Sequence, residues 1–187
     1  MRRMIGWLRT RELQMILWAN QRRSQSRLHR LLGVYLSTVT HVGGASFTLI
    51  SSFLVAMFAP NPWSTTGWQC FTAVFISHLP VYVVKRKLKR LRPYQALNGV
   101  NTGKNPLVDS SFPSGHTTAI FAYVVPIIGA GGVWFPIILP VAAVLALSVA
   151  WSRMYLGLHY PSDVAAGALV GTLTAITVQY SWTLTLF

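Results

Sequence analysis

The chain has 187 residues, of which 52% are hydrophobic and only 10% are charged, against roughly 25% charged residues in an average soluble domain. This composition excludes a disordered chain and argues against a soluble globule. The 16 Lys and Arg residues against three acids give a net charge of +13, and the chain has one cysteine. A single cysteine excludes an internal disulfide framework and a multi-cysteine metal site.

Residues 1–30 carry eight arginines interleaved with tryptophan, leucine and other apolar residues. This pattern predicts a basic amphipathic helix that lies on lipid headgroups, and a partly disordered basic tail is the alternative. A basic segment can also bind nucleic acid. The tryptophans and the apolar segments that follow favour anionic membrane lipids, and not nucleic acid, as the partner of the segment Arg2–Arg30.

Residues 31–187 are predicted to form one transmembrane domain, because long stretches of them carry no charge and a membrane-spanning helix needs about 20 apolar residues. Prolines and glycines divide these stretches. The spans are expected at Leu32–Phe58, at Gly67–Val84, on either side of Gly129–Gly132 within Phe112–Trp151, and at Val164–Tyr180. The sequence therefore predicts an all-α polytopic membrane bundle of about five transmembrane helices, with Gly167 and Gly171 spaced for close helix contact.

The basic residues are distributed on one side of this predicted bundle. With five spans, the N-terminal segment, the loop at 85–111 and the connection at 152–163 share a face, and they contain all 16 Lys and Arg residues. Loops rich in Lys and Arg stay in the cytoplasm. We therefore expect a multi-pass protein of the plasma membrane whose basic face is cytoplasmic.

The first group of residues suited to chemistry is the basic run from Lys85 to Arg92. A spacing of seven residues is two helical turns, so both side chains can face the same way on a helix. One guanidinium group can donate two parallel hydrogen bonds to phosphate oxygens, and lysine adds a point charge. The alternative is a charge cluster that anchors the preceding span.

The second group surrounds His116 at the start of a predicted span. Pro113 ends any preceding helix, and Ser114 is a natural N-cap. Helix N-termini bind anions through their unpaired N–H groups and their dipole. The alternative is that His116 merely lies at the membrane interface.

The third group precedes the last predicted span, with Pro161 in its first turn. His159 and Asp163 are four residues apart, so the carboxylate can reach one imidazole nitrogen. That contact would fix the tautomer and make the other nitrogen a better nucleophile. The alternative is a helix cap beside an interfacial histidine.

Together the three groups supply two imidazoles, a carboxylate and at least three cations, which is the set that phosphoryl transfer to an amino-acid nucleophile needs. There is no acidic cluster to hold Mg²⁺ or Ca²⁺, so the predicted chemistry uses no metal and no cofactor. His41 and His78, inside predicted spans, are expected to hydrogen-bond between helices. For His41 the alternative is a place beside the site.

The three groups resemble, in order and spacing, the tripartite motif of the phosphatidic acid phosphatase type 2 superfamily, which includes membrane lipid phosphatases, bacterial soluble acid phosphatases and vanadium haloperoxidases. The matching segments are Lys85-(six residues)-Arg92-Pro93, Pro113-Ser114-Gly115-His116 and Ser152-Arg153-(five residues)-His159-(three residues)-Asp163. The resemblance extends from Ser37 to Tyr180 and points to the bacterial membrane branch. Members of that branch typically have six spans, and here the arginine-rich helix takes the place of the first.

The resemblance implies a role for each motif residue. His159 would attack phosphorus and form a phosphohistidine, Asp163 would orient His159, and His116 would protonate the leaving oxygen. The phosphate oxygens would be bound by Lys85, Arg92, Ser114, Gly115 and Arg153.

The function expected from these features is a metal-independent lipid phosphate phosphatase acting on phosphatidic acid or phosphatidylglycerophosphate. The alternative is an undecaprenyl pyrophosphate phosphatase that recycles the cell-wall lipid carrier. An alternative of another class is a non-catalytic membrane scaffold. The sequence makes no prediction of the oligomeric state.

Overall fold

The computed structural model describes residues 2–21, 26–103 and 106–184, which fold into α-helices and two short 3-10 helices without a strand. The elements are α1 (Arg2–Gln21), α2 (Arg27–Val39), η1 (Thr40–Gly43), α3 (Ala45–Phe58), α4 (Trp63–Leu88), α5 (Pro93–Ala96), α6 (Gly115–Gly129), η2 (Gly132–Trp134), α7 (Phe135–Tyr155) and α8 (Pro161–Leu184). The predicted all-α fold is confirmed.

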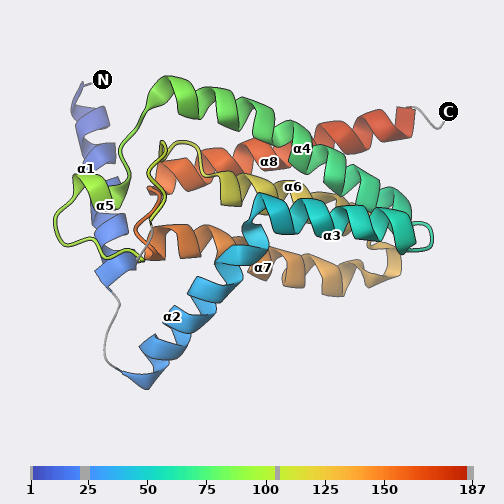
Figure 1. Cartoon of the computed structure of the whole chain (residues 1–187), viewed down its shortest axis with the longest axis horizontal. Helices are drawn as coiled ribbons and strands as arrows, with labels where there is room; N and C mark the ends of the chain where they lie inside the picture. Colours follow the sequence, from blue (N-terminus) through green and yellow to red (C-terminus); the bar gives the residue numbers. More distant parts are fainter. Residues whose placement is uncertain (1, 22–25, 104–105, 185–187) are drawn as a thin grey trace.

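Helices α3, α4, α6, α7 and α8 run side by side along the long axis of the molecule (Figure 1), and α6 contacts each of the other four. The most extensive packing is between α6 and α8. A Cβ atom at Gly167 would lie 2.6 Å from the carbonyl oxygen of Ser114, and one at Gly171 would clash with the carbonyl oxygen of Thr118. The close helix contact predicted for these two glycines is therefore confirmed, and it holds the N-terminal ends of α6 and α8 together.

The number of membrane spans differs in detail from the prediction. By length and apolar composition, three stretches of the described chain qualify as spans: Trp63–Ala96, Gly132–Tyr155 and Pro161–Leu184. Helices α2 and α3 qualify as a fourth only if they are counted as one span bent by 59°. The remaining predicted span, α6, is apolar but has only 15 residues, which is shorter than a typical transmembrane helix.

The first predicted span is not a straight helix, because the chain turns at η1. Gly43 in this turn is buried, and a Cβ atom there would clash with the side chain of Val149 and lie 3.1 Å from the carbonyl oxygen of His116. The glycine thus lets the bend approach α6 and α7 closely. His78, which was expected to hydrogen-bond to a neighbouring helix, instead bonds through Nδ1 to the carbonyl oxygen of Val74 in its own helix. That prediction is therefore wrong.

The N-terminal segment forms helix α1, which crosses the end of the bundle beside α5 (Figure 1). Its apolar residues Ile16 and Ala19 pack against Met154 and Tyr160. The Asn20 amide is also buried and donates to the carbonyl oxygens of Asn101 and Tyr155. One side of α1 therefore packs against the helical bundle and the loop that contains Asn101.

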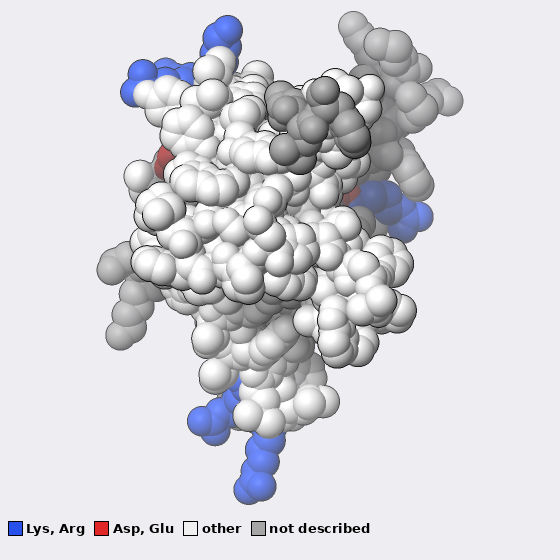
Figure 2. All heavy atoms as spheres, turned by 90° about the vertical axis from the view of Figure 1, so that its right-hand side faces the viewer, with Lys and Arg blue, Asp and Glu red and all other residues white. Residues whose placement is uncertain are grey.

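The opposite end of the bundle carries the turns at 59–62 and 130–131, which contain no charged residue. In the view onto this end, described Lys and Arg side chains are visible only around the margin (Figure 2). The basic loops gather instead where α4 and α7 end and where α6 and α8 begin (Figure 1). The fold thus brings the three candidate groups to one end of the bundle.

Candidate active site

His159 lies in the short connection between α7 and α8, with 1% of its surface exposed. Its Nδ1 atom is 2.7 Å from the carbonyl oxygen of Ser111, and its Nε2 atom is 3.2 Å from Nη1 of Arg92. A carbonyl oxygen only accepts hydrogen bonds and a guanidinium only donates them. These two partners therefore fix the tautomer, with the proton on Nδ1 and the lone pair on Nε2.

Asp163 lies in the first turn of α8, as predicted, but it does not hydrogen-bond to the imidazole. Its Oδ2 atom is 3.7 Å from Nδ1 of His159, which is too long for a hydrogen bond. Oδ2 instead accepts from the backbone N–H of Tyr160 at 2.8 Å. The predicted role of Asp163 in fixing the tautomer is therefore wrong in its geometry, because the carbonyl of Ser111 takes that position.

The imidazole of His159 is held in its neutral form. Burial lowers its pKa well below the ordinary value of 6.5, and the charges of Arg153, Arg92 and Lys85 lower that pKa further. The hydrogen bond to the Ser111 carbonyl acts in the opposite direction and is outweighed. Near neutral pH Nε2 therefore keeps its lone pair, and this lone pair can attack an electrophile once the hydrogen bond from Arg92 opens.

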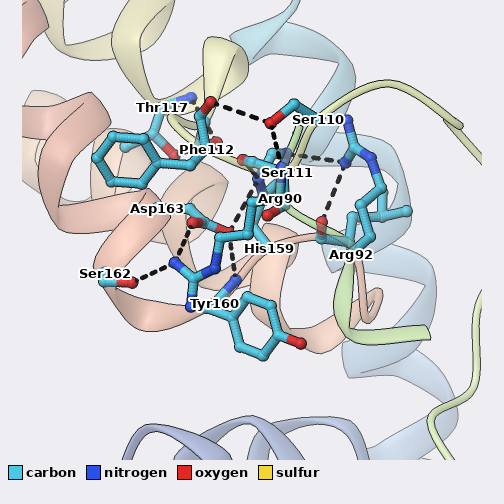
Figure 3. A network of polar contacts seen from close by, with 12 residues as sticks. Arg90, Arg92, Ser110, Ser111, Phe112, Thr117, His159, Tyr160, Ser162 and Asp163 are labelled. Atoms are coloured by element: carbon cyan, nitrogen blue, oxygen red, sulfur yellow. Dashed lines mark hydrogen bonds and ion pairs between the residues drawn. The ribbon is translucent and has the colours of Figure 1, made fainter. Parts of the chain in front are cut away.

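Arg90 is a central residue of the site that sequence reasoning missed (Figure 3). Its Nη1 atom donates to Oδ1 of Asp163 and to Oγ of Ser162, both at 2.7 Å. Its Nη2 atom is 2.9 Å from Oε2 of Glu12 in α1, and its guanidinium lies 4.2 Å from the ring centroid of Tyr160. Arg90 thus neutralises the buried Asp163 and links it to α1. In the sequence nothing distinguishes it from its neighbours in the basic run.

Lys85 and Arg92 do meet, although not on one helix face. Helix α4 ends at Leu88, and Lys89 has a left-handed backbone with φ of 31°, so the argument from helical turns is wrong. The two cations converge on Asp109, with Nζ of Lys85 and Nη2 of Arg92 each 2.6 Å from a carboxylate oxygen. Asp109 is a second residue that the sequence analysis missed.

The Asp109 carboxylate is ionised. Partial burial acts to raise its pKa, but the hydrogen bonds and charges of Lys85 and Arg92 outweigh burial, so the pKa lies below its ordinary value of 3.8. Arg92 is fully buried, whereas the Asp109 side chain is 51% exposed. Asp109 thus pairs with two of the predicted phosphate-binding cations at the solvent side of the site and offsets one of their two positive charges.

The predicted N-cap of α6 is confirmed, since the Ser114 hydroxyl accepts from the backbone N–H of Thr117. Gly115 is the first residue of the helix, and no atom lies within 4 Å of the place where its Cβ would be. His116, in the same turn, lines a cavity together with Arg153, and the backbone N–H of Ser114 donates to the carbonyl oxygen of Asp163 at 3.0 Å. Ser114, Gly115 and His116 therefore face the same cluster as His159.

Arg153 lies in the last turn of α7 and is 2% exposed. Its Nη1 atom donates to the hydroxyl of Thr40 in η1 at 2.7 Å. All eight predicted site residues thus lie at one end of the bundle, on α4, α6, α7, α8 and the loops between them. Within the described ranges, no three His, Cys, Asp or Glu side chains are grouped as metal ligands would be.

Comparisons with known proteins identify relatives of this arrangement. Residues 66–185 match the family described as the PAP2 superfamily. A decaprenylphosphoryl-5-phosphoribose phosphatase of Mycobacterium tuberculosis (strain ATCC 25618 / H37Rv) is 33% identical over 134 residues, which are 70% of this chain and 69% of the relative. An undecaprenyl-diphosphatase of Sulfolobus acidocaldarius is 34% identical over 98 residues, which are 52% of this chain and 46% of the relative.

The fold is similar to that of a solved structure. The crystal structure of Aquifex aeolicus LpxE matches with a TM-score of 0.77 and 23% identity, over 90% of this chain and 94% of that chain. In sequence, the chain spans about half the length of most of the curated relatives that it matches.

The tautomer and the lowered pKa of His159 can be measured by nitrogen-15 NMR of protein labelled at its histidines. We expect a neutral ring protonated at Nδ1, whose signals do not shift between pH 7.5 and pH 5.5, because burial and three nearby cations oppose protonation. The His159→Gln variant assigns the signal. A titration midpoint near 6.5, or a proton on Nε2, would contradict the geometry described above.

Proposed function

Because this chain belongs to the PAP2 superfamily, we propose that it is a membrane phosphatase that releases inorganic phosphate from a lipid phosphate. The observation that carries the proposal is the buried, neutral His159, whose Nε2 lone pair is directed at Arg92. A nucleophilic nitrogen beside a cation that binds phosphate oxygens is the arrangement that attack on phosphorus requires.

In the first step the Nε2 lone pair of His159 attacks phosphorus, and a P–N bond forms while the P–O bond to the leaving group breaks. The negative charge of the bound phosphate favours the protonated form of His116, and His116 then gives its proton to the leaving oxygen. The proton stays on Nδ1, which keeps donating to the Ser111 carbonyl. The Asp163 carboxylate, 3.7 Å from Nδ1, stabilises the positive charge that develops on the ring.

In the second step a water molecule attacks the phosphohistidine. His116, now neutral, takes the proton of this water, the P–N bond breaks, and its electron pair returns to Nε2. The phosphate oxygens are bound in both steps by Lys85, Arg92 and Arg153 and by the N-terminus of α6 at Ser114 and Gly115. These cations supply the positive charge that metal ions supply in other phosphoryl-transfer sites.

The proposed substrate is a lipid phosphomonoester such as phosphatidic acid or phosphatidylglycerophosphate. The second candidate is undecaprenyl pyrophosphate, which the name of the Sulfolobus acidocaldarius relative favours. A non-catalytic scaffold is the weakest of the three candidates, since a scaffold gains nothing from burying a histidine among cations, which costs free energy.

The proposal extends to the membrane and to the N-terminal segment. We place the protein in the plasma membrane with its basic end in the cytoplasm, because the Lys and Arg residues gather at that end and loops rich in them stay in the cytoplasm. Residues 1–30 are proposed as a basic amphipathic segment that binds anionic lipids, and residues 31–187 as the transmembrane phosphatase domain. Arg27 and Arg30, which line a surface pocket with Leu31 and Val34 on α2, suit contact with lipid headgroups.

The proposed orientation predicts which end of the protein an impermeant reagent reaches. Val108 and Val133 are 83% and 89% exposed at opposite ends of the bundle, and each can be changed to cysteine after Cys70→Ala removes the native thiol. In intact cells we expect an impermeant maleimide to label Val133→Cys but not Val108→Cys, and inverted vesicles to show the reverse. Labelling of Val108→Cys in intact cells would place the site outside.

The roles of the two site histidines predict different losses of activity. His159→Ala is expected to lower turnover at least about 1,000-fold on every phosphate ester, because the nucleophile is lost. His116→Ala is expected to lower turnover about 100-fold or more on a lipid phosphate but far less on p-nitrophenyl phosphate, whose leaving group needs no proton.

Phosphate release by the purified protein measures both effects, with His78→Ala as the control that keeps full activity. Vanadate is expected to inhibit phosphate release, whereas EDTA is expected to leave it unchanged. Equal losses on both substrates for His116→Ala would refute its role as the acid, and inhibition by EDTA would refute the metal-independent mechanism.

A further inference from the structure

Glu12 of α1 contacts the site end of the bundle from a distant part of the chain. Its Oε2 atom is 2.9 Å from Nη2 of Arg90. Its Oε1 atom accepts from the backbone N–H of Ser162 at 3.1 Å and from the Ser162 hydroxyl. The Glu12 side chain is only 17% exposed. Charge-assisted hydrogen bonds are strong and directional, so these contacts give Glu12 a fixed position and restrain the Arg90 guanidinium.

Arg90 is connected to both groups that lie beside Nδ1 of His159. Its Nη1 atom donates to Asp163 at 2.7 Å, and its backbone carbonyl accepts from the N–H of Ser111 at 2.9 Å. The Ser111 carbonyl in turn accepts from Nδ1 of His159, and the Asp163 carboxylate is 3.7 Å from the same nitrogen. Figure 3 shows these side chains together. A displacement of Arg90 would therefore reach the His159 ring by two routes.

The charges of this network do not cancel. Arg90 pairs with the carboxylates of both Glu12 and Asp163, and its positive charge offsets only one of the two negative charges. Without Glu12, Arg90 would cancel the charge of Asp163. With Glu12, the group keeps a net negative charge beside a ring that becomes positive when His159 attacks phosphorus. This step rests on the proposed function, since it takes the role of His159 from there.

The attachment of α1 to the bundle does not account for this acid. The apolar side of α1 packs through Ile16 and Ala19, and the buried Asn20 amide donates to two backbone carbonyl oxygens. Glu12 lies one helical turn before Ile16, at the edge of a cavity of about 480 Å³ that Arg90 also lines. Ion pairs that are open to solvent add little to stability. The Glu12–Arg90 pair therefore suits a role in the reaction better than a role in holding α1.

We propose that Glu12 is a positioning residue of the phosphatase reaction. It restrains Arg90 against Asp163 and gives the group Glu12–Arg90–Asp163 a net negative charge, which stabilises the positive ring of His159 in the first step. Glu12 acts through Arg90 and Asp163 and takes no part in binding the phosphate. Helix α1 thus has a second role beside the lipid binding proposed above.

The test measures kcat and KM of the full-length purified protein in matched micelles. The substrates are phosphatidic acid, undecaprenyl pyrophosphate and p-nitrophenyl phosphate, so that the result does not depend on the lipid head group. Glu12→Gln removes the charge and keeps the shape, whereas Glu12→Asp keeps the charge on a shorter side chain. Gln14→Ala, at an exposed position of the same helix, is the control. Glu12→Gln is also combined with Asp163→Asn, and thermal unfolding measures the stability of each variant.

We expect Glu12→Gln to lower kcat about tenfold on every substrate that the wild type cleaves, the effect of one charge-assisted hydrogen bond, with KM nearly unchanged. Glu12→Asp should keep most of the activity, and Gln14→Ala should keep all of it. When Asp163→Asn is already present, Glu12→Gln should have almost no further effect, because the carboxylate through which it acts is gone.

An unchanged kcat for Glu12→Gln, or a raised KM with kcat unchanged, would overturn the proposal. An equal loss with Glu12→Asp, or a loss of the same size when Asp163→Asn is present, would overturn it too, because the charge acting through Asp163 would then not be the cause. A Glu12→Gln variant that does not fold would assign Glu12 to stability and overturn it as well. Wild-type protein that cleaves none of the three substrates would instead refute the proposed function, and the role of Glu12 with it.

Discussion

The site depends on one buried histidine held between an acceptor and a donor. The Ser111 carbonyl accepts a hydrogen bond from Nδ1–H of His159, and the Arg92 guanidinium donates one to Nε2. Neither contact would fix the ring alone, because an imidazole can rotate and exchange tautomers. Together they present a neutral nucleophile toward the cations that bind phosphate. The loops around His159 are arranged so that these two partners reach it.

The positive charge of the site imposes a second constraint, since several cations lie close together with few acids to balance them. Asp109 pairs with Lys85 and Arg92 near the solvent, and Asp163 pairs with Arg90 in the interior. Buried charges are stable only when they are paired and hydrogen-bonded. The chain's few acids are therefore placed where the cations gather, and Glu12 extends the same network to α1.

The sequence predicted features that depend on local patterns. The Ser114 cap, the start of the last helix at Pro161 and the close packing at Gly167 and Gly171 follow from residue type and spacing, and the structure confirms them. Contacts between distant segments were missed, because nothing local shows that Arg90 pairs with Asp163 or that the Ser111 carbonyl replaces the expected carboxylate. The bend at η1 was missed for the same reason, since it depends on packing against Val149.

The central claim is that Nε2 of His159 attacks phosphorus, and trapping the covalent intermediate tests it most directly. The purified protein would be mixed with a lipid phosphate labelled in its terminal phosphate, quenched within milliseconds and digested. We expect a label that is stable in alkali and labile in acid, bound to the peptide that contains His159 and absent from His159→Ala, with His78→Ala labelled normally. Phosphate release without any labelled protein, or a label on another residue, would contradict the mechanism.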